Sequence, residues 1–172
     1  MDLSLYLPQF VYGSTDGIVT TFAIVAGAAG ANLKPLAILA IGIASVLADG
    51  YSMGISAYLS KTAEEDTPIS KDSQDKEDTR TPQSVGIATF LSFVLMGTIP
   101  IIPFMLPKSV ISFGYAKLAS LCLALIAFFS VGYIKGVYHK DENSPFQSGV
   151  QTFGIGLSAA IVAYFAGYYV GG

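Results

Sequence analysis

Asp16, Asp49 and Met53 are the residues of this chain whose types and spacing could do chemistry. Asp49 is the only charged residue in the run from Pro35 to Ser60, and it stands 14 residues into that run. As a helix, the run would be ~39 Å long, more than the ~30 Å hydrocarbon core of a bilayer. A carboxylate in mid-span costs roughly 2.5–3.5 kcal/mol, and such residues usually face a polar path or a partner. The position of Asp49 therefore favours transport across a membrane.

A second carboxylate is expected at the same depth. Asp16 precedes Asn32 by 16 residues, and Asp49 follows Pro35 by 14, on either side of one short connection. On two antiparallel helices, both carboxylates would lie ~21–24 Å from that connection. Further polar or sulfur-bearing side chains lie one helical turn from each aspartate. The predicted polar stripe consists of Asp16, Thr20, Ser45, Asp49 and Met53.

Two carboxylates and a thioether are typical ligands for a divalent transition metal ion. Oxygen ligands alone would suffice for Mg²⁺ or Ca²⁺, whereas the sulfur of Met53 favours a softer ion. Two neighbouring carboxylates in a membrane also favour retention of protons, which an entering metal ion would displace. The stripe could therefore couple metal movement in one direction to proton movement in the other. Alternatively, Met53 could serve packing alone.

Further acidic residues follow the second apolar run directly. Glu64 and Glu65 could concentrate cations at the mouth of a pathway, or they could belong to a solvated helix end. His139 lies in a charged loop and Cys122 is the single cysteine, so no His/Cys metal set and no disulfide framework is expected. With no nucleophile–base pair in view, we expect neither an enzyme nor a resident cofactor.

Composition places the chain in a membrane. Of its 172 residues, 52% are hydrophobic and 12% are charged, with a mean hydropathy of +0.59. Soluble domains carry about 25% charged residues. The first ten residues lack the basic region of a signal peptide, so we expect them in the mature protein. The expected partners are the lipid bilayer, protons and the transported ion, with no nucleic acid.

The predicted fold is all-α, with five transmembrane helices in a single transporter domain. The expected spans are residues 8–31, 35–60, 84–106, 114–136 and 148–170, with a polar cytosolic loop over residues 61–83. Only 15 apolar residues follow Asp16 in the first run, too few to cross, so the helix should begin upstream of it. In the alternative, Ser14 to Asp16 cap a short interfacial helix. Pro100, Pro103 and Pro107 predict a kink or an early end in the third span.

Basic residues predict the orientation of the chain. Lys61, Lys71, Lys76 and Arg80, with Lys135 and Lys140, fall on the side of the N-terminus. Lys34, Lys108 and Lys117 fall on the other side. Cytoplasmic loops are enriched in Lys and Arg. We therefore expect a cytoplasmic N-terminus and a lumenal or extracytoplasmic C-terminus.

Several motifs, in order along nearly the whole chain, resemble the vacuolar iron transporter family. They are YGSTDGIVTTFAIVAGAAG from Tyr12 to Gly30, LADGYSMGISAYLS from Leu47 to Ser60, TFLSF from Thr89, GTIPIIP from Gly97 and SPFQSG from Ser144. The resemblance implies five helices, a homodimer with the pathway between its first two helices, and export of Fe²⁺ or Mn²⁺ from the cytoplasm against protons. It also implies that Asp16 and Met53 lie in the pathway and that Glu64 ends the second helix on the cytosolic side.

The chain departs from that family at two places. Plant and parasite members carry a glutamate where this chain has Ser45, and Asp49 could supply the missing charge one turn on. Those members also insert a metal-binding domain after the second span, whereas residues 65–81 are too few to form one. The chain resembles the shorter nodulin-like or prokaryotic branch.

We therefore expect a homodimeric exporter of Fe²⁺, with Mn²⁺ as a further candidate, in exchange for protons. Metal ligands would be Asp16, Asp49 and Met53, with Ser45 and Thr20 as secondary oxygen donors and Glu64 and Glu65 at the mouth. The rival interpretations are a passive divalent-cation channel and a non-transporting membrane scaffold. The expected location is the plasma membrane in a prokaryote, or a vacuolar or other organelle membrane in a eukaryote.

Overall fold

The computed structural model describes residues 3–66, 79–107, 109–138 and 144–171, and every regular element among them is helical. Five long helices make up the fold, and three short helical elements accompany them. The long helices are α1 (Leu7–Gly30), α2 (Pro35–Asp66), α3 (Pro82–Thr98), α5 (Phe113–Tyr138) and α6 (Pro145–Gly171). The short elements are η1 (Leu3–Tyr6), η3 (Ile99–Ile101) and α4 (Ile102–Met105).

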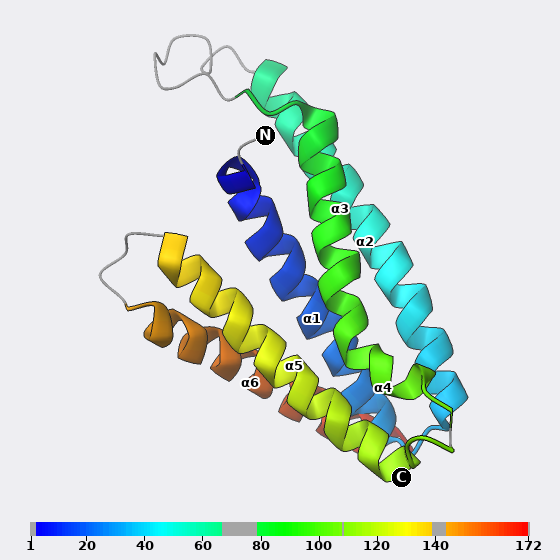
Figure 1. The fold of residues 1–172 in the computed structure, drawn as a ribbon. Coiled ribbons are helices and arrows are strands. Elements are labelled where there is room, and N and C mark those ends of the chain that lie inside the picture. Colours follow the sequence, from blue (N-terminus) through cyan, green and yellow to red (C-terminus); the bar gives the residue numbers. More distant parts are fainter. Residues whose placement is uncertain (1–2, 67–78, 108, 139–143, 172) are drawn as a thin grey trace.

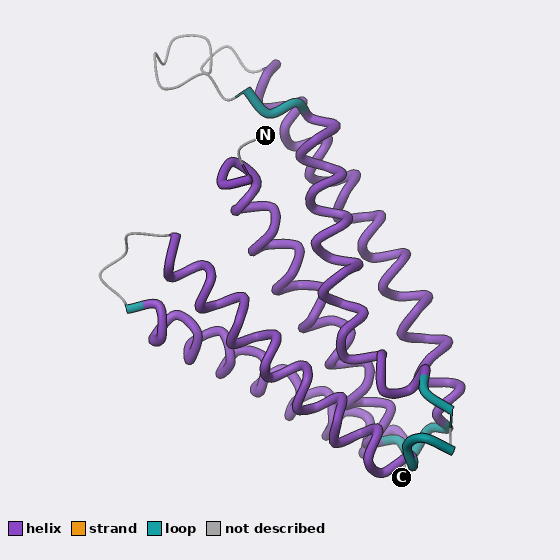
Figure 2. The backbone as a smooth tube through the Cα atoms, viewed as in Figure 1, coloured by secondary structure: helices purple, strands orange, loops and turns teal. Residues whose placement is uncertain are grey.

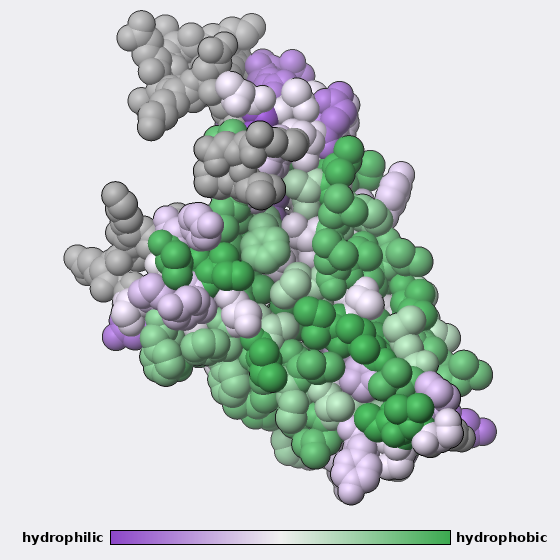
Figure 3. Space-filling model, viewed as in Figure 1, coloured by the Kyte–Doolittle hydropathy of each residue, from purple (hydrophilic) through white to green (hydrophobic). Residues whose placement is uncertain are grey.

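All five long segments can cross a bilayer, with the third counted from Pro82 to Met105. Hydrophobic side chains cover the middle of the face seen in Figure 3, and hydrophilic ones gather toward its two ends. The expectation of an all-helical fold with five membrane-spanning helices is thus confirmed for the described residues. The chain is a multi-pass integral membrane protein.

Helix α1 lies between two helix pairs, α2 with α3 and α5 with α6 (Figure 1). Helices α1, α3 and α6 run in one direction, and α2 and α5 run in the other. We call the end where α1, α3 and α6 begin the N-terminal end of the bundle, and the opposite end the C-terminal end. The helices converge toward the C-terminal end and spread toward the N-terminal end (Figure 2). The two chain termini therefore lie at opposite ends of the bundle, as five spans require.

Helices α1 and α2 form a hairpin with a very short connection. α1 is continuous from Leu7, with Pro8 in its first turn, so Asp16 lies well inside the helix. The interpretation of Ser14 to Asp16 as a helix cap is therefore wrong, and the upstream start of the first span is confirmed. The chain reverses over residues 31–34, where Asn32 has a φ of 54°. Asparagine tolerates this left-handed conformation better than most residues.

Helix α2 is longer than the sequence predicted. It continues through Asp66, so residues 61–66 are helical rather than part of a loop. No proline or glycine interrupts the chain between Ser60 and Pro68, and Lys61 pairs with Glu64 one turn away. Such pairs at i and i+3 stabilise a helix end. Most of the remaining predicted loop lies outside the described residues, and α3 begins at Pro82 behind an N-cap on Thr81.

The third span bends where its prolines predict. Regular α-helix ends at Thr98, and Pro100 and Pro103 lie in the short elements η3 and α4. A proline has no N–H and its ring crowds the preceding turn, so the α-helical hydrogen-bond pattern cannot continue. The carbonyl of Pro100 instead accepts a 2.6 Å hydrogen bond from the buried hydroxyl of Ser120 on α5. This bond ties the bend to the neighbouring helix.

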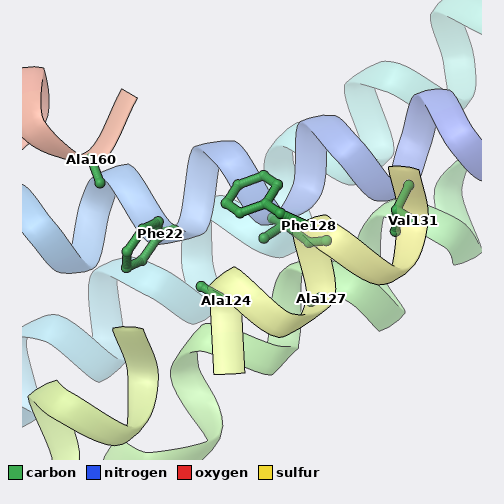
Figure 4. Packing of buried hydrophobic residues seen from close by; sticks show 7 residues of the cluster. Phe22, Ala124, Ala127, Phe128, Val131 and Ala160 are labelled. Carbon is green, nitrogen blue, oxygen red and sulfur yellow. The ribbon is translucent and has the colours of Figure 1, made fainter. Parts of the chain in front are cut away.

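Two apolar clusters hold the helices together. The larger joins α1, α5 and α6 around Phe22 and Phe128, whose rings meet edge to face at 6.3 Å (Figure 4). Small residues such as Ala124 and Ala160 fill the space around these rings. The smaller cluster includes Phe104 and joins α1, α2, α4 and α5 nearer the C-terminal end. Both clusters fix the position of α1 against its neighbours.

Glycines let α1 and α6 touch at the C-terminal end. A Cβ atom built on Gly167 would collide with the backbone of Gly27, and one on Gly30 would collide with the carbonyl of Tyr164. Small residues at helix contacts allow such close backbone approach in membranes. The C-terminal ends of α1 and α6 therefore form a closely packed pair.

Candidate functional site

The hairpin brings the two mid-span aspartates together. Asp16 on α1 and Asp49 on α2 lie close enough for their carboxylates to repel one another electrostatically. Asp16 is exposed on the surface of the single chain, and Asp49 is half-buried. The equal depth expected from counting residues is therefore observed, whereas metal binding by the pair stays a prediction.

The remaining members of the predicted stripe flank these carboxylates. Ser45 and Met53 are half-buried on α2, four residues before and after Asp49, and Thr20 is half-buried on α1. A step of four residues along a helix is ~6 Å and stays on one face. Oxygen and sulfur atoms thus follow one another along α2 through the middle of the membrane.

A cavity of about 540 Å³ opens beside Met53 at the N-terminal end of the bundle. We call it the vestibule, and α1, α2 and the start of α3 form its walls. Ser52, Ser56 and Ser60 line it from α2, and Glu64 lies at its outer end. The hydroxyls recur every four residues, so they form a ladder on one face of the helix. The vestibule offers a polar route from Glu64 to Met53.

Two basic side chains also line the vestibule. The guanidinium of Arg80 donates hydrogen bonds to the carbonyl of Leu5 at 3.0 Å and to Oε1 of Gln9 at 3.1 Å. These bonds fasten the start of α1 to the segment before α3. Lys61 is buried in the wall, and its ammonium lies 3.4 Å from Oε2 of Glu64. The vestibule is therefore not lined by negative charge alone.

Asp16 faces a different space. A crevice of about 490 Å³ runs between α1, α5 and α6, with mainly aliphatic walls that include Val19 and Val131. Asp16, Lys135 and Thr152 line it together, and Tyr12 borders both this crevice and the vestibule. The structure thus brings Asp16 close to Asp49 while opening Met53 and Asp16 to separate spaces.

The predicted ligands do not converge on one point within a single chain. Among the described residues, no three His, Cys, Asp or Glu side chains gather closely enough to hold a metal ion. Glu65 is exposed and follows Glu64 directly, about 100° further around α2. The glutamates lie at the outer end of the vestibule, 15 residues along α2 from Asp49 in the case of Glu64. A complete metal site would need backbone or hydroxyl oxygens, water, or a second copy of the chain.

Sequence reasoning missed several residues of the vestibule. The serine ladder of Ser52, Ser56 and Ser60 was visible as a repeat of four, because hydroxyls at that spacing share a helix face. The burial of Lys61 and the contact of Arg80 with Leu5 had no such signal, since each depends on how distant segments pack.

Comparison with known proteins gives a consistent result over the chain. A model of the VIT family matches residues 7–80 and 69–168. The chain is similar to the vacuolar iron transporter of Plasmodium berghei (strain Anka), with 46% identity over 61 residues, or 36% of this chain and 22% of that protein. The vacuolar iron transporter of Toxoplasma gondii (strain ATCC 50861 / VEG) is 49% identical over 61 residues, with shares of 36% and 20%. These matches span about a fifth of the length of the parasite proteins.

A plant relative aligns over most of both chains. Vacuolar iron transporter 1 of Arabidopsis thaliana is 26% identical over 211 residues, which cover 91% of this chain and 82% of the plant protein. Because 211 positions exceed the 172 residues of this chain, the plant protein carries inserted residues that this chain lacks.

Proposed function

Because the chain belongs to the VIT family, we propose that it carries a divalent transition metal ion across a membrane. Fe²⁺ is the first candidate, since the relatives are named vacuolar iron transporters, and Mn²⁺ is the second. The proposed direction is out of the cytoplasm, into a vacuole or another compartment, in exchange for protons. The observation that carries the proposal is the electrostatic proximity of Asp16 and Asp49 in the middle of the membrane-spanning hairpin.

The chemistry of the route supports a metal ion as substrate. An ion attracted by Glu64 would pass the serine ladder and meet the thioether of Met53 before the carboxylate of Asp49. Oxygen ligands alone attract many cations, and the sulfur adds preference for a transition metal. Protons on the Asp16–Asp49 pair would leave when the ion binds, because both compete for the same oxygens. Ser45 and Thr20 would offer oxygen atoms for the next step.

A homodimer would complete the site. Asp16 and Tyr12 of α1 and Ser52 of α2 are exposed in the single chain, although polar groups facing lipid are costly. Two copies facing each other across α1 and α2 would remove these groups from lipid and double the number of carboxylates. This arrangement would supply the ligands that one chain does not gather.

The test is metal and proton flux in liposomes that contain the purified protein and an internal pH-sensitive dye. Fe²⁺, Mn²⁺, Zn²⁺ or Mg²⁺ is added outside, and wild type is compared with Asp49→Asn. We expect Fe²⁺ to move protons, and Asp49→Asn to lower the rate by at least ~10-fold, as for loss of a metal-site carboxylate. The matched control is Asp66→Asn, the same chemical change at the exposed end of α2, with an expected change within ~2-fold.

The outcomes separate the rival functions. Metal entry without a proton signal would replace the exchanger with a passive cation channel. Unchanged flux in Asp49→Asn, or no metal entry with folded wild type, would overturn the proposal and leave the aspartates as structural residues of a scaffold.

A further inference from the structure

Lys61 is a buried cation in the wall of a space that is proposed to admit cations. Its side chain is 8% exposed, whereas that of its partner Glu64 is 65% exposed. The ammonium lies 3.4 Å from Oε2 of Glu64, one turn further along α2. Lysine is seldom buried so fully unless its charge is compensated. The burial of this lysine beside the mouth of the vestibule therefore needs an account.

Lys61 lies on the face of α2 that leads to Met53. The two residues are eight positions apart, or ~12 Å along the helix, and both line the vestibule together with Glu64. An ion that passes from Glu64 to Met53 must therefore pass the ammonium of Lys61. Positive charge at this position opposes entry of a divalent ion, unless the ammonium moves away.

We propose that Lys61 is a specificity-determining residue, a tethered cation that competes with the incoming ion for the Glu64 carboxylate. This inference rests on the proposed transport of a divalent metal ion. With the vestibule empty, the ammonium compensates Glu64; when a divalent ion binds that carboxylate, the ammonium withdraws. The four-carbon stem of lysine allows such a movement by bond rotation, with no shift of the α2 backbone.

The competition favours divalent over monovalent ions. A side chain fixed one turn away is present at an effective concentration in the millimolar range or above. A potassium or sodium ion carries the same single charge as the ammonium, so it gains little by displacing it. A divalent ion carries twice the charge and gains more from the same carboxylate. Competition also weakens capture at the mouth, which lets the ion move on toward Met53.

Equilibrium Mn²⁺ binding tests this role without transport. The full chain in detergent is titrated with Mn²⁺, and free Mn²⁺ is followed by electron paramagnetic resonance at low and high KCl. Lys61→Met keeps the apolar stem and removes the charge. We expect it to tighten Mn²⁺ binding by about 2–5-fold, the size set by a partly exposed ion pair, and to make binding more sensitive to KCl. Lys61→Arg, which keeps the charge, should resemble wild type more closely.

The double-mutant cycle with Glu64→Gln makes the test specific. The effect of Lys61→Met should vanish when Glu64 is already neutral, because no shared carboxylate remains. Lys135→Met is the matched control, since it removes a lysine from the same end of the bundle outside the vestibule. It should leave Mn²⁺ binding unchanged within error. Lys61→Gln repeats the measurement if Lys61→Met does not fold.

Two results would overturn the inference. One is unchanged or weaker Mn²⁺ binding in folded Lys61→Met, and the other is equal tightening with and without Glu64. The proposed function is judged separately by liposome flux. Absence of flux in all variants would refute transport, whereas the binding cycle would still report whether Lys61 and a divalent ion compete at Glu64.

Discussion

The two ends of the bundle are built from different residues and pack to different densities. At the C-terminal end, Gly27 and Gly30 of α1 meet α6 backbone to backbone. At the N-terminal end, the same helix is separated from its neighbours by the vestibule and the crevice, of about 540 and 490 Å³. The side chains there are serines, lysines, arginine and glutamate rather than glycines. The difference indicates a structure open toward the N-terminal end and closed at the other.

The largest effect is expected from adding a side chain at the closed end. Gly167→Leu would force α1 and α6 apart, since even a Cβ atom at this position collides with Gly27. We expect a loss of about 3 kcal/mol in the free energy of unfolding, measured by denaturant titration in detergent. Gly154→Leu is the matched control on the same helix, because nothing lies within 4 Å of a Cβ there. Equal stability of the two variants would refute the difference in packing between the ends.

A smaller loss is expected at the proline bend that supports the closed end. Ser120→Ala removes the hydroxyl that donates to the buried carbonyl of Pro100. An unsatisfied buried carbonyl costs about 1–2 kcal/mol, which the same unfolding measurement would detect. Ser130→Ala provides the control, because Ser130 bonds only within its own helix among the hydrogen bonds described, to the carbonyl of Ile126. A loss in Ser130→Ala as large as in Ser120→Ala would contradict the assignment.

The smallest effect is expected at the open end and should stay local. Arg80→Ala removes the bonds to Leu5 and Gln9 that hold the start of α1. Amide hydrogen exchange in η1 and the first turn of α1 should become up to ~10-fold faster, equivalent to about 1.4 kcal/mol. Amides near Gly27 should not change. Exchange that accelerates equally at both ends would mean that the ends are not independent, and Arg80→Lys should fall between the two.

Residue counting predicted the hairpin and its carboxylates because both depend on local geometry. The early start of α1 followed from the number of apolar residues after Asp16, and the depth of Asp49 followed from helical rise. The continuation of α2 through Asp66 was missed, because a polar composition is compatible with both a loop and an exposed helix. The burial of Lys61 was also missed, since burial is set by α1 and the segment before α3 rather than by residues near it in sequence.

The tight turn at Asn32 also bears on how the protein reaches its membrane. Of the five spans, α1 is the least hydrophobic, and it carries Asp16. Joined to α2 by only four residues, it has no independent loop to leave on one side of the bilayer during synthesis. The two helices must therefore insert as a pair, with the more apolar α2 offsetting the cost of the polar α1. A longer connection would uncouple them and expose the weaker span to failed insertion.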